Sequence, residues 1–196
     1  MLEAIFAQTT NHIIGGNNKL PWTSTKYKEF SRWDMDLFKD LTKRKNIIMG
    51  WNTWESLNCK PLKDRHTHYI VTTRKSGKEY ICDTEIQYIT LPELYNIINE
   101  NIDKNFVIIG GPSLIDEFYF KIDKVYITTF NFPDFYGKEN EYDTFSPLTF
   151  KSVSKLEWRW VRALKMSKTI NNVDGTVQML TAEHYEYERI HSTINV

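Results

Sequence analysis

One acidic side chain lies among apolar neighbours in a pattern that indicates chemistry. The stretch 33–42 is typical of a helix, and at about 100° per residue Asp34 shares a face with Phe38 and Leu41. A carboxylate on such a face is costly unless it is paired, hydrogen-bonded or turned toward a ligand, because burial disfavours its charged form. Two interpretations stay open: Asp34 lies in the first helical turn behind an N-cap at Ser31, or it faces a ligand.

Two short apolar runs, 46–50 and 106–110, end in glycine just before residues that favour a helix. Such strand ends leave backbone N–H groups free, and anionic ligands bind there in α/β sheets. Gly110-Gly111 would let a ligand approach the backbone, and Pro112 suits the opening of a helix. Tight packing of strand against helix explains the paired glycines equally well. The sequence has no GxGxxG or P-loop motif, so a nucleotide site would use another glycine pattern.

Basic residues follow the apolar run that ends near 73. Arg74 and the hydroxyls of Thr72 and Thr73 are suitable groups for binding a phosphate. A solvated basic loop at 74–78 is the alternative interpretation, because exposed lysine and arginine clusters are common at loop tips.

These residues have to be positioned by strands that alternate with helices. The expected strands are 4–7, 46–50, 69–73, 86–90, 106–109 and 124–130; the expected helical segments are 33–42, 53–57 and 91–100; a terminal hairpin joins 158–164 to 176–190. The loop 13–22 is either a plain turn or a segment that folds back over something apolar, and its apolar ends favour the second interpretation. Residues 131–147 are expected to form an irregular aromatic loop. The pattern predicts an α/β fold with a mostly parallel sheet and an antiparallel edge.

Composition indicates a globular protein. The 196 residues include 25 basic and 25 acidic side chains, so charge gives no reason to expect nucleic acid or a membrane surface as a partner. Cys59 and Cys82 form no CxxC pair, which predicts free thiols and no metal site. No apolar run approaches the roughly 20 residues needed to cross a bilayer, and no signal segment precedes the first strand, so a cytoplasmic location is expected.

Taken together and in order, these stretches resemble dihydrofolate reductase. The matching segments cover roughly residues 1–130, and the closing strand at 185–188 is also similar; the segments are Ala7, Ile14-Gly15, Asn18-x-Leu20-Pro21-Trp22, Asp34-x-x-x-Phe38-Lys39-x-x-Thr42, Ile48-Met49-Gly50-x-x-Thr53-Trp54-Glu55-Ser56-Leu57, Pro61-Leu62-x-x-Arg65, Ile109-Gly110-Gly111 and Tyr126-x-Thr128. The chain departs from the family pattern in a longer segment at 23–33, in Trp51-Asn52 where many members carry a basic residue, and in Ile115 where a tyrosine is common.

The resemblance implies a single dihydrofolate reductase domain over 1–196, with a central, mostly parallel eight-stranded sheet, an antiparallel C-terminal edge strand and flanking helices. It implies NADPH-dependent reduction of 7,8-dihydrofolate to 5,6,7,8-tetrahydrofolate, by hydride transfer to C6 and protonation at N5, in support of one-carbon and thymidylate metabolism. Antifolates such as methotrexate or trimethoprim would bind the same site. We expect a monomer with no nucleic-acid or membrane partner.

The resemblance also implies residue roles. Asp34 would bind the pterin's N3 and 2-amino group, Thr128 would steady that carboxylate, and Trp22 would help hold a water molecule. Burial of the acid is expected to raise its pKa. The implied substrate-binding residues, of which Arg65 would pair with the glutamate carboxylate, are Ile5, Met35, Phe38, Leu57, Leu62, Arg65 and Ile109.

The implied cofactor site takes NADPH rather than NADH, because Thr72, Thr73 and Arg74 would receive the 2′-phosphate. A cis peptide would join Gly110 to Gly111, as in the family. The full set of implied cofactor residues is Ala7, Ile14, Gly15, Asn18, Leu20, Gly50, Trp51, Asn52, Thr53, Thr72, Thr73, Arg74, Gly110, Gly111, Pro112, Ser113 and Leu114.

Two rival functions can be compared with this one. The related reductase of riboflavin biosynthesis shares the fold but acts on a ribosylamino-pyrimidine, and it lacks the combination of Trp22, Asp34 and Arg65. A non-catalytic binder of folate or a dinucleotide is the second rival, because a fold does not fix a function. Retention of both the acid and the glycines argues against it.

Overall fold

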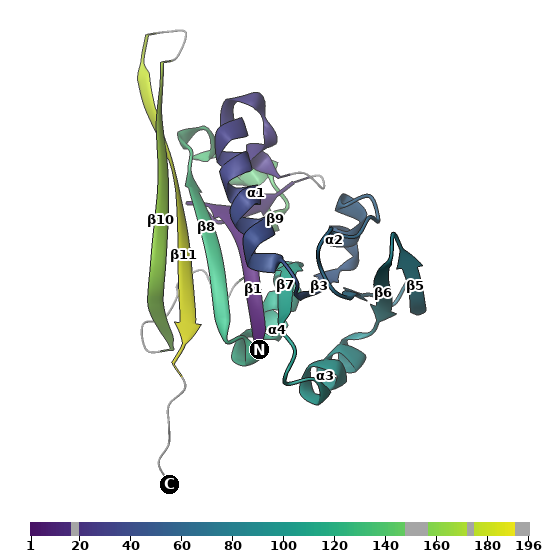
Figure 1. Cartoon of the computed structure of the whole chain (residues 1–196). Helices are drawn as coiled ribbons and strands as arrows, with labels where there is room; N and C mark the ends of the chain where they lie inside the picture. Colours follow the sequence, from purple (N-terminus) through teal and green to yellow (C-terminus); the bar gives the residue numbers. More distant parts are fainter. Residues whose placement is uncertain (17–19, 148–156, 172–174, 191–196) are drawn as a thin grey trace. The chain divides into compact units, whose positions relative to one another are not determined.

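A computed structural model describes residues 1–16, 20–147, 157–171 and 175–190 (Figure 1). The chain divides into two compact units. Unit 1 comprises Met1–Ile5 and Met35–Asp123, and unit 2 comprises Phe6–Asp34 and Lys124–Val196. Two elements, β1 (Leu2–Thr9) and α1 (Lys28–Thr42), run through the division. Asn18, predicted to bind the cofactor, lies outside the described residues.

Unit 1 is built on a mostly parallel sheet. Its strands lie in the order β1, β7 (Phe106–Gly110), β3 (Asn46–Gly50), β4 (His68–Val71), β6 (Thr84–Ile89) and β5 (Gly77–Ile81), and only β5 and β6 pair antiparallel. The runs predicted from continuous apolar sequence form its centre: Ile47, Ile48, Val107 and Ile108 are fully buried. A strand covered on both faces requires such a run.

Short helices follow the strands of unit 1. They are α2 (Trp51–Ser56), α3 (Leu91–Glu100) and α4 (Pro112–Glu117), and the 3-10 turn η3 (Tyr119–Lys121) follows α4. The bounds of α3 agree with the prediction. Its capping box explains why it starts where it does: the Thr90 backbone N–H donates to the Glu93 carboxylate at 2.7 Å.

Unit 2 is mainly antiparallel. Its strands lie in the order β10 (Trp158–Asn171), β11 (Val177–Arg189), β8 (Lys124–Asn131) and β1, and β10 with β11 forms the long hairpin of Figure 1. A separate two-stranded sheet pairs β2 (Ile13–Gly15) with β9 (Thr144–Phe145). The 3-10 turns of this unit are η1 (Pro21–Thr23), η2 (Thr25–Tyr27), η4 (Pro133–Phe135) and η5 (Glu139–Glu141).

Aromatic rings fill the core of unit 2. The rings of Trp22 and Phe130 have centroids 4.5 Å apart, and Tyr27 stacks on Phe132 at 4.3 Å. Ile13 belongs to the same buried cluster. The described ends of this segment, 13–16 and 20–22, therefore contribute Ile13 and Trp22 to an apolar core, as their apolar residues indicated.

The predicted start of the acidic helix is wrong. Helix α1 begins at Lys28 rather than near residue 33, so Asp34 lies beyond the first turn. Ser31 is inside the helix and is no N-cap, since its hydroxyl donates to the Trp22 backbone carbonyl at 2.5 Å. The polar composition of 23–32 concealed the early start of the helix. Its buried aromatic residues, Tyr27 and Phe30, lie among polar and charged neighbours. The interpretation of Asp34 as a first-turn acid is thereby excluded.

Among the described residues, the main sheet has one strand more than predicted, and the small sheet of β2 and β9 was not predicted. Nine strands pair in the main sheet rather than eight, and the additional one is β5. Its sequence GKEYI is largely exposed and so lacks the apolar signal of a strand. The turn to β6 uses Cys82 and Asp83 at φ of 48° and 62°, where glycine or asparagine would have been the recognisable signal. The remaining outline, a mostly parallel sheet with antiparallel C-terminal strands and few flanking helices, confirms the predicted α/β class.

Both cysteines are exposed free thiols, as predicted. Among the residues that the structure describes, no helix has the length and apolar character needed to traverse a bilayer. The same residues include no group of three or more histidine, cysteine, aspartate or glutamate side chains placed to hold a metal ion.

Candidate functional site

The site in unit 2 is centred on Asp34 of α1. Its carboxylate accepts a hydrogen bond from the hydroxyl of Thr128, which β8 carries and which is 2% exposed. Burial raises the pKa of Asp34 from 3.8 to about 6, and the hydrogen bond from Thr128 opposes part of that rise. The structure therefore brings together Asp34 and Thr128, which were predicted as a pair. Asp34 is a carboxyl with a raised pKa, and the hydroxyl of Thr128 stabilises its ionised form.

A third polar residue extends this pair. Strand register places His184 of β11 directly opposite Thr128, and the Thr128 Oγ1 lies 3.0 Å from the His184 Nδ1. His184 is 1% exposed, and in the described part of the chain its buried Nε2 has no hydrogen-bond partner. Sequence reasoning missed His184. The available signal was a polar residue in a closing strand that pairs with the strand of Thr128.

Trp22 lies in the aromatic core of unit 2, where it is 2% exposed, and half-buried Ala7 packs against the same cluster. Gly15 of β2 is buried and Ile14 is half-buried, whereas Leu20 is 42% exposed. The water-holding role of Trp22 stays a prediction.

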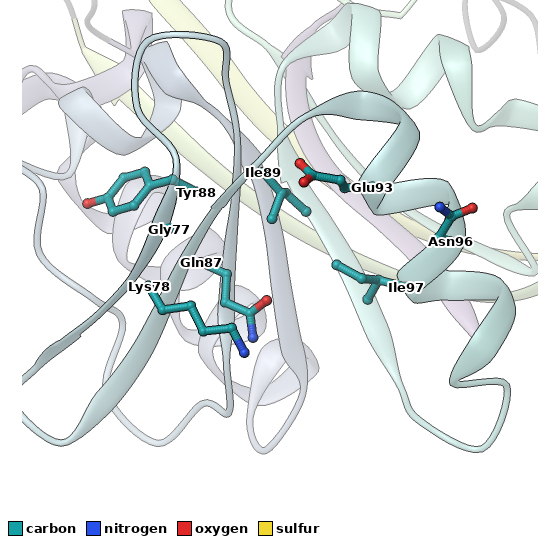
Figure 2. A pocket seen from close by; sticks show the side chains of 8 residues that line it. All are labelled: Gly77, Lys78, Gln87, Tyr88, Ile89, Glu93, Asn96 and Ile97. Atoms are coloured by element: carbon teal, nitrogen blue, oxygen red, sulfur yellow. The ribbon is translucent and has the colours of Figure 1, made fainter.

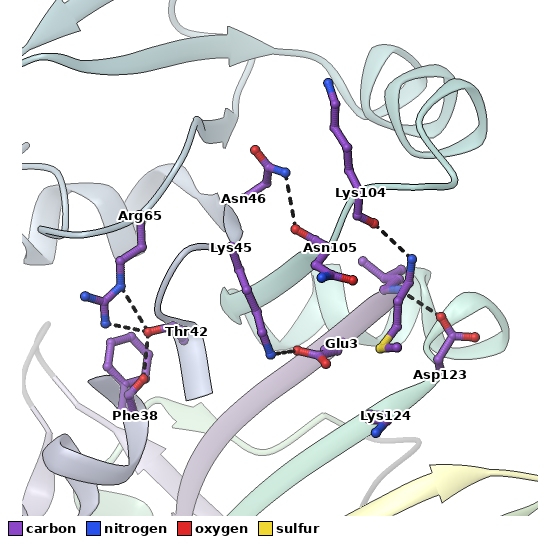
Figure 3. Close-up of polar contacts among 12 residues, drawn as sticks. Glu3, Phe38, Thr42, Lys45, Asn46, Arg65, Lys104, Asn105, Asp123 and Lys124 are labelled. Carbon is purple, nitrogen blue, oxygen red and sulfur yellow. Dashed lines mark hydrogen bonds and ion pairs between the residues drawn. The ribbon is translucent and has the colours of Figure 1, made fainter. Parts of the chain in front are cut away.

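Unit 1 contains the predicted substrate residues. Met35 is exposed and Phe38 half-buried on α1, while Leu57 and Leu62 are half-buried and Ile5 is buried. Figure 3 shows the guanidinium of Arg65 at the Thr42 hydroxyl, to which it donates at 2.6 Å. The guanidinium also donates to the Lys39 carbonyl at 3.1 Å. The Thr42 hydroxyl in turn donates to the Phe38 carbonyl at 2.6 Å. Arg65 is thus fixed to the end of α1.

The glycine that ends β7 packs closely against α2. A Cβ on Gly110 would lie 2.4 Å from the Thr53 Oγ1, and one on Gly111 would lie 3.8 Å from the Gly50 backbone nitrogen. Ile109 and Gly110 are half-buried at the end of β7, and Gly50 caps α2. The interpretation of Gly110 as tight packing is confirmed. Pro112, Ser113 and Leu114 form the first turn of α4, as predicted.

The predicted cis peptide between Gly110 and Gly111 is wrong, since the described residues contain no cis peptide bond. Gly111 instead turns the chain with a left-handed backbone, φ 86° and ψ 91°. An L-residue with a Cβ rarely adopts such an angle, so glycine is required here for a reason other than the predicted one.

The basic loop after β4 contains one anchored arginine. The guanidinium carbon of Arg74 lies 5.5 Å from the centre of the Trp51 ring, and its backbone N–H donates to the Thr72 hydroxyl at 3.0 Å. The Trp51 Nε1 is buried and has no hydrogen-bond partner among the described residues. Asn52 and Thr73 are exposed beside them. Residues 73–78 are all exposed, so the solvated-loop interpretation stays open beside the phosphate-binding one.

A separate cavity of about 330 Å³ lies in unit 1 (Figure 2). No predicted site residue lines it; its lining residues are Gly77, Lys78, Gln87, Tyr88, Ile89, Glu93, Asn96 and Ile97. Two of its charged groups already have partners, because Lys78 pairs with Glu85 at 3.3 Å and Glu93 caps α3.

Comparison with known proteins decides the family. The family model described as dihydrofolate reductase matches residues 1–185. The chain belongs to the dihydrofolate reductase family. The resemblance inferred from the motifs is thereby confirmed, and the matched range includes every residue of the predicted site.

Individual members of the dihydrofolate reductase family differ considerably in sequence from this chain. The dihydrofolate reductase of Ureaplasma parvum is 35% identical over 118 residues, covering 60% of this chain and 67% of that protein. The dihydrofolate reductase of Buchnera aphidicola subsp. Baizongia pistaciae is 28% identical over 181 residues, covering 91% of this chain and 96% of that protein. A solved Enterococcus faecalis dihydrofolate reductase, complexed with NADP(H) and RAB-propyl, covers 97% of both chains with a TM-score of 0.69 at 22% identity, and so supports the fold.

Proposed function

We propose that this protein catalyses the NADPH-dependent reduction of 7,8-dihydrofolate to 5,6,7,8-tetrahydrofolate. The observation that carries the proposal is a desolvated carboxyl, Asp34, hydrogen-bonded by Thr128 in a chain of the dihydrofolate reductase family. The reaction adds a hydride to C6 and a proton to N5 of the pterin, so two electrons enter the C=N bond. When bound, NADPH supplies the hydride.

Asp34 acts on the pterin in this proposal. Its two carboxyl oxygens accept hydrogen bonds from N3–H and the 2-amino group, which fixes the ring, and the negative charge favours protonation of N5. With a pKa of about 6, the Asp34 carboxyl is mostly ionised at neutral pH. This pKa also lies near the operating pH, where a group that takes part in proton transfer is most effective. Arg65, anchored on Thr42, pairs with the glutamate carboxylate of the substrate.

Residues of unit 1 fit NADPH. The buried and unpartnered Trp51 Nε1 is a donor that requires an acceptor, and a 2′-phosphate oxygen is one. The guanidinium of Arg74 lies over the same indole ring and would supply the positive charge that this phosphate needs. Many family members carry a basic residue after Met-Gly, where this chain has Trp51-Asn52. The helix starts at Gly50 and Gly111, where α2 and α4 begin, would approach the pyrophosphate.

Arg74→Ala tests the cofactor assignment. We expect the KM for NADPH to rise about tenfold or more, because a charge-assisted hydrogen bond to phosphate is lost, while the KM for NADH stays unchanged. Lys75→Ala is the matched control, since it removes the same charge from the same loop but from a side chain that pairs with Glu79 at 3.0 Å. Steady-state kinetics with both cofactors measure the effect. Equal changes for NADPH and NADH would contradict the role of Arg74.

The activity itself is tested by the loss of reduced-nicotinamide absorbance when the purified protein is mixed with NADPH and dihydrofolate, with and without methotrexate. Methotrexate-sensitive oxidation supports the proposal. NADPH binding without oxidation of dihydrofolate, but with oxidation on a ribosylamino-pyrimidine, would favour the riboflavin-type reductase. Binding without turnover of either substrate would favour a non-catalytic binder.

The proposal includes further expectations about the protein's partners and place. We propose a single-domain, monomeric enzyme of the cytoplasm that binds dihydrofolate and antifolates such as methotrexate or trimethoprim. Support comes from family membership and from the two exposed free thiols, which suit a reducing compartment. Sedimentation and cell fractionation test these points.

A further inference from the structure

We propose that His184 is a positioning residue for Asp34: it donates a hydrogen bond from Nδ1 to the Thr128 hydroxyl and so fixes that hydroxyl as a donor to the Asp34 carboxylate. The functional meaning of these hydrogen bonds rests on the role proposed for Asp34. The hydrogen bonds themselves do not depend on that role, because all three residues belong to unit 2. The direction of each hydrogen bond can be measured in the protein without any ligand.

Proton counting gives the direction of the hydrogen bonds. The Thr128 hydroxyl has one proton, which is shared between Asp34 on one side and the His184 Nδ1, 3.0 Å away, on the other. If Thr128 donates to the carboxylate, it must accept from His184, and the imidazole must carry its proton on Nδ1. The alternative, in which Thr128 donates to His184, leaves the ionised Asp34 without a donor in the described part of the chain.

The unpartnered Nε2 of His184 favours the same direction. With the proton on Nδ1, the buried Nε2 is an acceptor without a donor. With the proton on Nε2, it would be a buried N–H without an acceptor, and orphaned N–H groups are the rarer and costlier kind. Burial therefore selects the tautomer that makes His184 a donor to Thr128.

The charged groups around His184 leave the imidazole neutral. Burial lowers the pKa of His184 to about 4; Glu186 opposes this and Arg162 adds to it, and those two form an ion pair with each other at 2.6 Å. Tyr126 stacks on the imidazole with ring centroids 6.3 Å apart. At neutral pH His184 thus acts through one N–H group and not through a charge.

The ionised form of Asp34 depends on the hydrogen bonds through Thr128 to His184. No charged group in the described part of the molecule shifts the pKa of Asp34, so the carboxylate relies on the Thr128 hydroxyl. A hydroxyl that accepts a hydrogen bond becomes a stronger donor, since bonds in a chain polarise one another. His184 consequently favours the ionised form of Asp34 and keeps its pKa from rising further.

Two amide substitutions test the proposal. His184→Asn places an amide N–H near the position of Nδ1, whereas His184→Gln places it near Nε2. We expect His184→Gln to raise the pKa of Asp34 by roughly half a unit or more, because the carboxylate loses its strengthened donor, and His184→Asn to leave it close to the native value. The measurement is the carboxyl ¹³C titration of Asp34 in the ligand-free protein. Equal shifts in both variants, or no shift in a folded His184→Gln protein, would overturn the proposal.

Thr128→Val provides the matched background. In a Thr128→Val protein, His184→Gln should cause no further change in the pKa of Asp34, because the intermediary hydroxyl is already absent. A purely structural role of His184 would instead lower stability in both backgrounds and leave the titration of Asp34 unchanged.

A measurement on the unaltered protein covers the case in which a variant fails to fold. Imidazole ¹⁵N chemical shifts distinguish the two tautomers, and the proton is expected on Nδ1; a proton on Nε2 would overturn the proposal. Reductase activity is the second readout, whose pH profile should move with the pKa of Asp34 in His184→Gln. Should the protein lack that activity, the proposed function fails while the tautomer and the titration still decide the role of His184.

Discussion

Asp34→Asn should lower the reductase rate by about two to four orders of magnitude at neutral pH while making the folded protein more stable. The rate falls because the amide keeps a similar shape but loses the charge that favours protonation of the pterin, and electrostatic and proton-transfer contributions of one group are typically of this size. Asp36→Asn is the control on the same helix, since Asp36 is exposed and pairs with Lys39 at 3.0 Å. A near-native rate for Asp34→Asn would remove the proposed role of Asp34.

The gain in stability follows from the shifted pKa of Asp34. Burial raises that pKa from 3.8 to about 6, so the folded state binds the proton more tightly than the unfolded state. Protonation of Asp34 therefore favours folding fully below pH 3.8, and this contribution is lost as the pH rises through about 6. Above that pH the ionised carboxyl costs up to about 3 kcal/mol, because each pKa unit corresponds to about 1.4 kcal/mol.

Denaturant unfolding at several pH values measures this difference. We expect Asp34→Asn to raise the free energy of unfolding by about 1–3 kcal/mol at pH 8 and by little at pH 4, where the native carboxyl is protonated in the folded state. Asp36→Asn is measured alongside as the control from an exposed position on the same helix. A stability difference that is independent of pH would mean that the carboxyl of Asp34 is not desolvated.

Gly110→Ala should destabilise the fold by about 1–3 kcal/mol or more, the usual cost of forcing extra atoms into a packed core. The new Cβ would lie 2.4 Å, 2.7 Å and 3.0 Å from Oγ1, Cγ2 and Cβ of Thr53. Threonine is branched at Cβ and has few rotamers, so Thr53 cannot move aside and α2 would have to shift from β7. Thermal or denaturant unfolding measures the loss, and the KM for NADPH should rise with it.

Gly50→Ala is the matched control for this prediction. Gly50 also ends a strand and caps a helix, but its φ is −78° and a Cβ there would meet no atom within 4 Å. The free energy of unfolding of the Gly50→Ala protein should therefore change little. The double variant Gly110→Ala with Thr53→Ala should recover part of the loss, because two of the three close contacts disappear. If Gly110→Ala is as stable as Gly50→Ala, the packing between α2 and β7 is looser than the structure indicates.

The sequence predicted those elements whose local signals agree with their burial. Strand β3 and helix α3 were predicted with their observed bounds because one is a continuous apolar run and the other has both an amphipathic pattern and a capping box. Helix α1 was predicted too short, since Tyr27 and Phe30 lie among polar residues and only tertiary packing shows that they are core residues.

The candidate site was predictable only in part for a similar reason. Asp34 was identifiable because an acid on an apolar face is costly, and the family resemblance supplied Thr128. His184 was not, because its importance comes from the pairing of β8 with β11, which local sequence does not specify. The conformation of Gly111 was also missed, since paired glycines permit several backbone geometries.

Because β1 and α1 run through the division between the two units, neither unit is one continuous piece of chain. Unit 1 needs its first strand residues to pair with residues made much later, as Leu2 does with Phe106, and unit 2 needs β8 beside β1 from the beginning of the chain. Contacts this distant in sequence slow folding, because long loops must close before any energy is gained. All the residues of unit 1 are present only once synthesis has reached Asp123, and unit 2 needs residues from both sides of unit 1 in the sequence.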